Sequence, residues 1–200
     1  MKGNAMRILM VALGCLLLAA CGGGAGRRIE MAVYDLEVPT ASAAPVAVSL
    51  LERVEVRAPS WLAATSMQYR LAAEPGRRHG FADSRWAGPP AELLEGVLKR
   101  RLLAAAGQCR LRLDLEEFVQ VFDASGDSRA RLALGASLLS ARVDSKLLVR
   151  RFELELPAGR NAAAGAAAFA ELSEGLASAI AQWLAEAGRS PAGPAIACLR

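Results

Sequence analysis

The first 21 residues of this chain determine how much of it can fold. Lys2 and Arg7 precede an apolar run from Ile8 to Ala20, and Cys21 follows the small residues at the end of that run. This layout is typical of a secretory signal peptide. The run is shorter than the roughly 20 apolar residues that a transmembrane helix needs. We therefore expect residues 1–20 to be removed as a signal peptide and not to stay as a membrane anchor.

Cys21 gives this signal the form of a bacterial lipoprotein signal. The stretch before it resembles the lipobox, in which cleavage leaves an N-terminal cysteine that carries a diacylglycerol and a third acyl chain such as palmitate. Three acyl chains exceed the two membrane signals that stable anchoring requires. In Gram-negative lipoproteins an Asp at the position of Gly22 usually causes retention in the inner membrane, so the resemblance implies the periplasmic face of the outer membrane. Residues 21–30 are then the lipidated cysteine and a Gly-rich tether that reaches about 30 Å at most.

The remaining cysteines agree with an exported protein. Cys15 lies in the signal, so Cys109 and Cys198 are left as an even pair in an oxidising compartment. They can form one disulfide that fastens the C-terminal tail, or they can remain two free thiols, and the sequence leaves both open. The formal net charge of +4 includes the two bases of the signal, and the other charges are interspersed. We therefore expect a solvated surface and no nucleic-acid partner.

The apolar periodicity after residue 30 predicts strands, a helix, three strands and a second helix. Period-two alternation predicts the strands, and a turn at Pro75-Gly76 is expected to close a hairpin. The predicted strands cover residues 31–38, 46–58, 67–71, 79–86, 110–122, 129–138 and 148–156. At Glu116-Glu117 the alternation slips by one residue, which predicts a β-bulge.

Apolar stripes at helical spacing predict two helices. The first begins after Pro89 and is expected to end at Gly107, and the second follows Asn161 as its N-cap and ends at Gly188. Short connections between the last three strands favour an antiparallel meander. We therefore predict an α+β fold over residues 31–188, with a largely antiparallel sheet and two amphipathic helices packed on one face. Residues 189–200 are expected to form an irregular tail.

No group of residues in the sequence has the spacing of a catalytic or metal site. The only histidine, His79, stands beside two arginines in the predicted hairpin, and we interpret it as a solvated loop residue. No metal-ligand spacing, G-x-S-x-G elbow or P-loop is present. Glu116 and Glu117 are neighbours in a strand and are expected to point to opposite faces. We therefore predict no catalytic residue, no metal and no cofactor; a periplasmic hydrolase is an alternative that lacks its usual motifs.

Several short stretches occur in a characteristic order behind the lipobox. They are Tyr34-Asp35-Leu36, residues 51–58 with Trp61-Leu62, Met67-Gln68-Tyr69-Arg70, residues 81–90, residues 115–123, and the Ala-rich helix that ends near Trp183-Leu184. In this order they resemble the ABC-type transport auxiliary lipoproteins, a PqiC-like family. The tail with Cys198 does not match any part of that pattern.

The resemblance implies a subunit that is not an enzyme and works at the outer membrane. Its partner would be an MCE-domain protein of an ABC transport system that moves phospholipid between the membranes and supports envelope integrity, and a homo-oligomeric ring is expected. Trp61, Leu62, Phe81 and Trp86 lie beside turns and are candidate partner contacts, because aromatic side chains anchor interfaces; core packing is the other reading of all four. An assembly lipoprotein, either a pilotin or a lipopolysaccharide-export helper, is the alternative function, and the neighbouring genes would distinguish the two.

Overall fold

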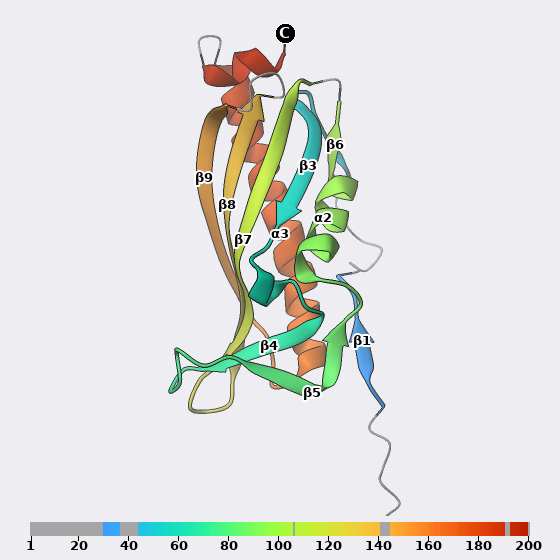
Figure 1. Ribbon diagram of the computed structural model, residues 1–200. Helices are drawn as coiled ribbons and strands as arrows, with labels where there is room; N and C mark the ends of the chain where they lie inside the picture. The colour runs from blue at the N-terminus through green and yellow to red at the C-terminus, as the bar shows by residue number, and fades with distance from the viewer. Residues whose placement is uncertain (1–29, 37–43, 106, 141–144, 191–192, 200) are drawn as a thin grey trace, which may run out of the picture. The chain divides into compact units, whose positions relative to one another are not determined.

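The chain after Glu30 folds around a seven-stranded sheet with helices on one face (Figure 1). The computed structural model describes residues 30–36, 44–105, 107–140, 145–190 and 193–199. Residues 31–200 form a unit of their own. The predicted signal peptide, Cys21 and the tether up to residue 29 lie outside the described residues. The prediction of an α+β fold is confirmed.

Three long antiparallel strands form the central part of the sheet. They are β7 (Cys109–Phe122), β8 (Ser128–Ser140) and β9 (Lys146–Pro157), and they pair in chain order as the predicted meander. The pairing of β7 with β8 shifts register between Leu115 and Glu117, which confirms the predicted bulge. Before the bulge, alternate leucines of β7 face the helices, and each is almost completely buried.

The other edge of β7 pairs with two strands in succession, both parallel to it. The first half of β7 pairs with β3 (Leu51–Arg57), and residues 120–122 pair with β4 (Ser66–Leu71). β4 forms the predicted hairpin with β5 (His79–Trp86), and β5 pairs in parallel with β1 (Ala32–Tyr34). Periodicity had indicated the strands and the hairpin, but not these parallel pairings, which give the largely antiparallel sheet a mixed edge.

Two predicted boundaries are wrong for the same reason. The expected strand over 46–58 is divided at Ser49-Leu50 into β2 (Val46–Val48) and β3, and the first helix, α2 (Pro90–Arg101), ends before Gly107. β2 pairs instead with β6 (Leu102–Ala104), which follows α2 directly. Gly107 does not cap α2; a Cβ at this position would lie 2.1 Å from the carbonyl carbon of Leu50, so the close approach of two backbones requires glycine there.

The second helix, α3 (Ala162–Arg189), is the longest described element and covers the inner face of the sheet. Its predicted N-cap is confirmed, because the Asn161 side chain accepts a hydrogen bond from the backbone N–H of Ala164 at 2.9 Å. The helix extends through Gly188 to Arg189. Among the described residues, neither helix has the length and apolarity needed to cross a bilayer.

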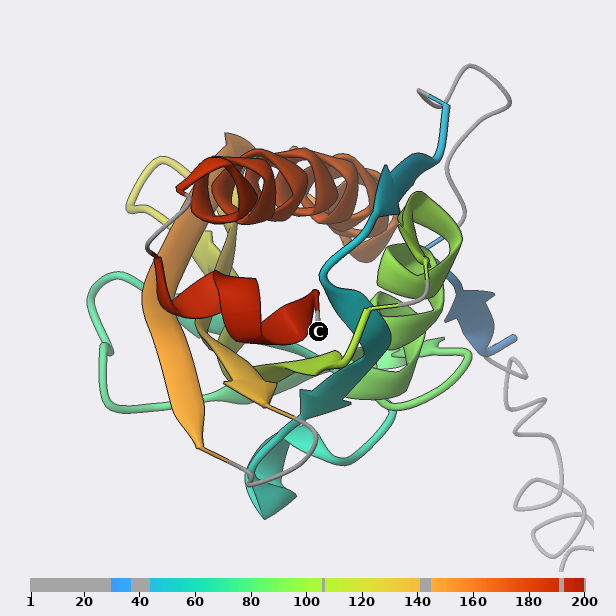
Figure 2. The ribbon, with the colours of Figure 1, turned by 90° about the horizontal axis from the view of Figure 1, so that it is seen from above.

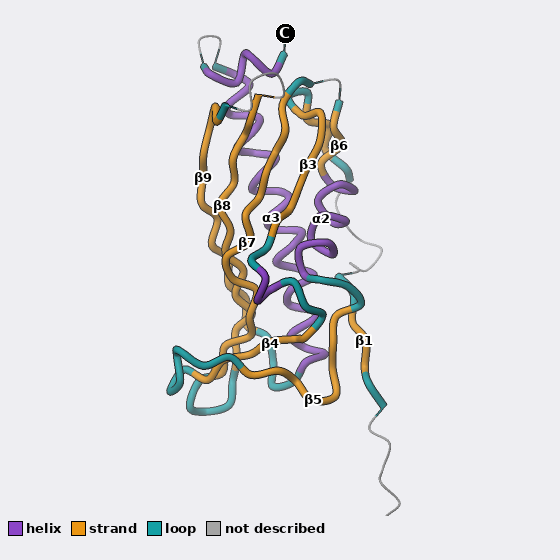
Figure 3. The backbone as a smooth tube through the Cα atoms, in the orientation of Figure 1, coloured by secondary structure: helices purple, strands orange, loops and turns teal. Residues whose placement is uncertain are grey.

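The described residues also form two short 3-10 helices, which Figure 3 shows with the other helices in purple. One, η2 (Ser60–Leu62), connects β3 to β4, and the other, η3 (Pro194–Cys198), lies in the tail that was expected to be irregular. Seen from above in Figure 2, η3 lies over the end of the sheet-and-helix sandwich. Ala195 and Cys198 are fully buried there.

Candidate docking surface

The structure separates the four candidate contact residues into two buried and two accessible ones. Leu62 and Trp86 are each 2% exposed and belong to the core. The indole of Trp86 packs edge-on against Phe118 and Phe169, with ring centroids 5.4 and 5.7 Å apart. These two side chains therefore cannot meet a partner without opening the fold, and the prediction that they form contacts is corrected to core packing.

Trp61 lies at the surface, where it is 45% exposed. The guanidinium carbon of Arg78 lies 4.1 Å from the centroid of its ring, a cation–π contact between η2 and the turn of the β4–β5 hairpin. The side-chain amide of Gln68 donates to the Trp61 carbonyl at 3.0 Å and accepts from Arg78 at 3.1 Å. The tryptophan is thus held in a fixed position although it is accessible.

Arg78 and Arg70 both bind the carboxylate of Glu117, at 3.1 and 3.0 Å. Partial burial lowers the pKa of Arg78 from its ordinary value, and the attraction of Glu117 acts in the opposite direction. We call Trp61, Gln68, Arg70, Arg78 and Glu117 the Trp61 patch. It combines an accessible aromatic side chain with a fixed arginine pair on the face of the sheet that the helices leave open.

The bulge places Glu116 and Glu117 on the same face of the sheet, which corrects the expectation that they point to opposite faces. Glu117 pairs with Ala133, and the carboxylate of Glu116 lies 3.6 Å from the position of a Cβ on Gly135, two residues further along that face of β8. The two acids still do not form a pair. Glu116 binds Arg151 on β9 at 2.9 Å, whereas Glu117 binds the arginines of the Trp61 patch.

Phe81 lies in a separate group of aromatic rings, on the other side of the hairpin. Its ring centroid is 4.8 Å from that of Tyr69, and the ring of Tyr69 is 5.6 Å from that of Phe122. These three rings line an open groove of about 450 Å³ between the β4–β5 hairpin and the β7–β8 turn, together with small residues of β5 and of the β7–β8 turn. We call it the aromatic groove.

His79 has a structural role at the edge of this groove. It is the first residue of β5, its ring stacks on Tyr69 at 5.0 Å, and its Nε2 lies 3.2 Å from a carboxylate oxygen of Glu74. Its side chain is only 19% exposed, so the interpretation of a solvated loop histidine is wrong. Among the described residues, no three His, Cys, Asp or Glu side chains gather closely enough to hold a metal ion.

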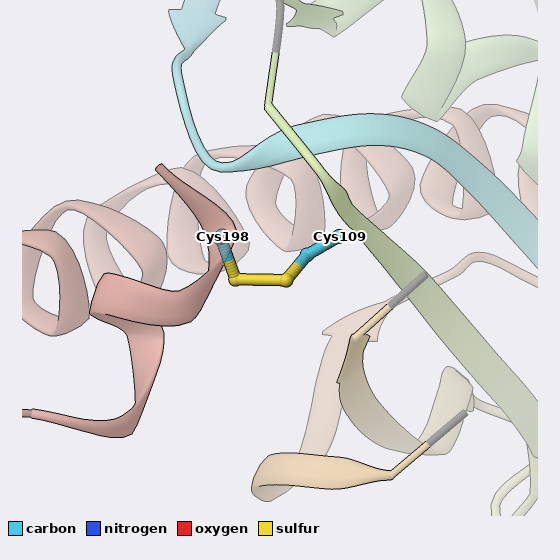
Figure 4. The surroundings of a disulfide bond; sticks show 2 residues. All are labelled: Cys109 and Cys198. Atoms are coloured by element: carbon cyan, nitrogen blue, oxygen red, sulfur yellow. A yellow bond between two sulfur atoms is a disulfide. The ribbon is translucent and has the colours of Figure 1, made fainter. Parts of the chain in front are cut away.

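The structure joins Cys109, at the start of β7, to Cys198 in η3 by a disulfide (Figure 4). The backbone N–H of Gln108 also donates to the carbonyl of Cys198 at 2.8 Å. Both sulfur-bearing residues are fully buried. The disulfide thus fixes the tail at the end of the domain away from the β4–β5 hairpin (Figure 1).

Sequence reasoning identified Trp61 and Phe81 but missed the residues that make each of them a site. Arg78 and Glu117 are distant in sequence and meet only because β4 and β7 are neighbours. Tyr69 and Phe122 lie in strands that the periodicity predicted, but the contact between those strands was not predicted.

Comparisons with known proteins give a family and a fold. The model of a family described as ABC-type transport auxiliary lipoprotein component matches residues 34–181. A solved protein of Xanthomonas campestris superimposes with a TM-score of 0.63 at 20% identity, covering 76% of this chain and 93% of that chain. Another solved protein, described as uncharacterized, gives a TM-score of 0.55 at 16% identity, covering 78% and 99%. No match to a curated protein was found.

Proposed function

The chain belongs to the family of ABC-type transport auxiliary lipoprotein components, and we propose that it is the outer-membrane subunit of an MCE-type transport system. In this role it is anchored on the periplasmic side by acyl chains at Cys21 and docks the component that spans the periplasm. Phospholipid would be the transported molecule, and envelope integrity would depend on the transport. The observation that carries the proposal is the family match, which runs from β1 to the last turns of α3.

The proposed work is binding and not chemistry. The acids that could act in hydrolysis are held by arginines, Glu117 by Arg70 and Arg78 and Glu116 by Arg151. A carboxylate whose oxygens are engaged in ion pairs is poorly placed to contact a substrate. Accessible aromatic side chains suit a docking role better, since Trp, Tyr and Arg dominate the binding energy of protein interfaces.

Within this function, we assign the contact with the MCE-domain protein to the Trp61 patch. Trp61 is held by Arg78 and Gln68 before any partner arrives, so little side-chain entropy is lost on binding. The arginines beside it can meet acidic groups on the partner while they remain paired with Glu117. Self-association into a ring is part of the proposal, and it would present several copies of the patch to one partner.

A pull-down with the mature lipoprotein tests this function. The bait is the full lipidated chain, and the prey is the MCE-domain protein encoded beside it. Replacing Trp61 by Ala should weaken binding by about 30-fold, the effect of an interface hot spot, and should leave the melting temperature unchanged because the indole is half exposed. Val149→Ala is the matched control, since Val149 is an exposed apolar residue of β9.

Two results would count against the proposal. If the folded partner does not bind the wild-type chain at all, the transport role is wrong. If the partner binds and Trp61→Ala binds equally well, the role stands but the assignment to the Trp61 patch is wrong. Capture of a secretin or of a lipopolysaccharide-export protein would instead support the alternative of an assembly lipoprotein.

A further inference from the structure

Accessible apolar side chains gather at the end of the domain where β1 begins, which is the point at which the tether joins the folded domain. β1 starts at Ala32 and pairs with the second half of β5, and the first half of the same β5 strand lines the aromatic groove. Met31 and Val33, beside this point, are 45% and 51% exposed. Figure 1 shows β1, the β4–β5 hairpin and the β7–β8 turn at one end of the sheet. The aromatic groove and the junction between the tether and β1 therefore lie at the same end of the domain.

The length of the tether limits how this end can face the membrane. The segment from Gly22 to Met31 spans at most about 35 Å when fully extended. Helix α3 has 28 residues, which gives it a length of about 42 Å. The start of β1 and the N-terminal end of α3 lie at the same end of the domain (Figure 1). With acyl chains on Cys21, the tether is too short to run the length of the domain. An orientation that rests on η3 is therefore excluded, and one in which the β1 end faces the bilayer is allowed.

The lining of the aromatic groove suits hydrocarbon. The rings of Tyr69, Phe81 and Phe122 form its wall, and they are only half-buried. Exposed apolar patches of this kind usually mark a binding surface, because leaving such area in water is unfavourable. Leu71 adds a further apolar side chain to the lining. Four other lining residues are small and leave the groove open, namely Gly80, Ala82, Ala124 and Gly126.

The polar groups near the groove do not oppose an apolar occupant. Asp123 lines the groove, but its carboxylate accepts hydrogen bonds from the Ser125 hydroxyl and from the backbone N–H of Asp127. Arg77, in the β4–β5 turn, is 69% exposed and forms an ion pair with Glu74 at 3.4 Å. A guanidinium has five N–H donors, so Arg77 keeps donors that a lipid phosphate can bind while this pair remains. Basic and aromatic side chains around an apolar contact are the usual composition of a surface that lies in a membrane interface.

We propose that the aromatic groove receives an acyl chain of the bilayer that anchors the protein, so that this end of the domain rests in the membrane interface. The proposal rests on the lipid anchor at Cys21 that the proposed function includes. It does not depend on the identity of the protein partner. Contact between the aromatic groove and the membrane orients the domain. The disulfide-linked tail then points away from the anchoring membrane, and the Trp61 patch lies on the open face of the sheet.

Photolabelling from within the bilayer tests this proposal. The full lipidated chain is reconstituted in phosphatidylcholine vesicles that contain a phospholipid with a diazirine at the end of one acyl chain. After irradiation, adducts should appear in the tryptic peptides 79–85 and 113–129, which contain Phe81 and Phe122. Ala82→Glu with Ala124→Glu adds two carboxylates at exposed groove positions and should lower this labelling about tenfold, because charged groups exclude hydrocarbon.

The controls separate this result from loss of anchoring or of folding. Ala104→Glu adds one carboxylate at an exposed position of β6, away from the groove, and should leave the labelling unchanged. All variants stay on the vesicles through Cys21, so reduced labelling cannot come from detachment. The proposal is overturned if groove peptides stay unlabelled while other peptides of the domain are labelled, if the Ala82→Glu, Ala124→Glu variant labels like wild type, or if labelling requires the MCE-domain protein. Undiminished binding of that protein by the same variant shows that the proposed function stands independently.

Discussion

Two glycines of α3 should respond in opposite ways to the same added methyl group. In a helix interior, replacing Gly by Ala ordinarily stabilises by about 1 kcal/mol. At Gly175 an added Cβ would meet the nearest atom, Cδ2 of Leu154, at 3.7 Å, an ordinary contact. At Gly165 it would lie 2.2 Å from Oε1 of Gln120. The free energy of unfolding should therefore rise in Gly175→Ala and fall in Gly165→Ala.

The size of the effect at Gly165 follows from what holds Gln120. Its side chain is 1% exposed, and its amide nitrogen donates to the Ser128 hydroxyl at 2.7 Å and to the Gly159 carbonyl at 3.1 Å. Making room for the methyl group moves this amide away from its acceptors, and an unsatisfied buried polar group costs about 1–3 kcal/mol. After the gain in helix propensity, Gly165→Ala should lose about 1–2 kcal/mol, and Gly175→Ala should gain about 0.5–1 kcal/mol.

Urea unfolding followed by tryptophan fluorescence measures both changes. The variant Gln120→Ala should itself be less stable, because it removes the bonds to Ser128 and Gly159. Adding Gly165→Ala to it should then cost nothing or stabilise, since the clashing oxygen is gone; this coupling is the specific signature of the contact. The reasoning is refuted if Gly165→Ala is as stable as wild type, or if its loss is the same with and without the Gln120 side chain.

Three further outcomes are expected. Replacing Cys109 and Cys198 by Ala opens a link between residues 89 positions apart, which should cost about 4–5 kcal/mol and lower the melting temperature by about 10 °C in calorimetry. Asn161→Ala should cost about 1 kcal/mol in urea unfolding, whereas Asn161→Ser should retain the cap. The hydrogen bond from Ser125 lowers the pKa of Asp123; because the folded-state pKa is the lower one, the stabilisation is complete above the unfolded-state pKa and is lost as pH falls through the folded-state value. An NMR titration should therefore show a higher Asp123 midpoint in Ser125→Ala.

The features that periodicity predicted correctly are those that depend on residues close together in the sequence. The stripe and cap of α3, the three-stranded meander and the bulge at Glu116 all appear where the pattern places them. In each case the signal lies within about a dozen residues and reflects which side chains face the core. The resemblance to the auxiliary lipoproteins likewise depended on local stretches in order, and the family match confirms it.

The features that were missed depend on residues far apart in the chain. Nothing near Leu102 shows that it leaves α2 to pair with β2, because the strand partner lies more than fifty residues away. Trp61 and Leu62 look equivalent in the sequence, yet one is accessible and the other is buried. Arg78 and Glu117 form their ion pair only because β4 and β7 are neighbours. The sequence thus identified aromatic residues as candidate contacts, but it did not show which of them are accessible at the surface of the fold.

The gap between the two parallel neighbours of β7 has a mechanical consequence. β3 leaves β7 at Asp114 and β4 joins it at Gln120, so among the described strands no partner lies on that edge from Leu115 to Val119. The bulge at Glu116 falls within this interval. Only three pairs of residues continue the β-ladder from β7 to the hairpin. The rest of the connection is made by side chains, namely the packing of Trp86 on Phe118 and the ion pairs of Arg70 and Arg78 with Glu117, so a load on the hairpin is carried mainly by side-chain contacts. A change in the length or tilt of the β4–β5 hairpin in a homologue therefore leaves the buried leucines of β7 in place.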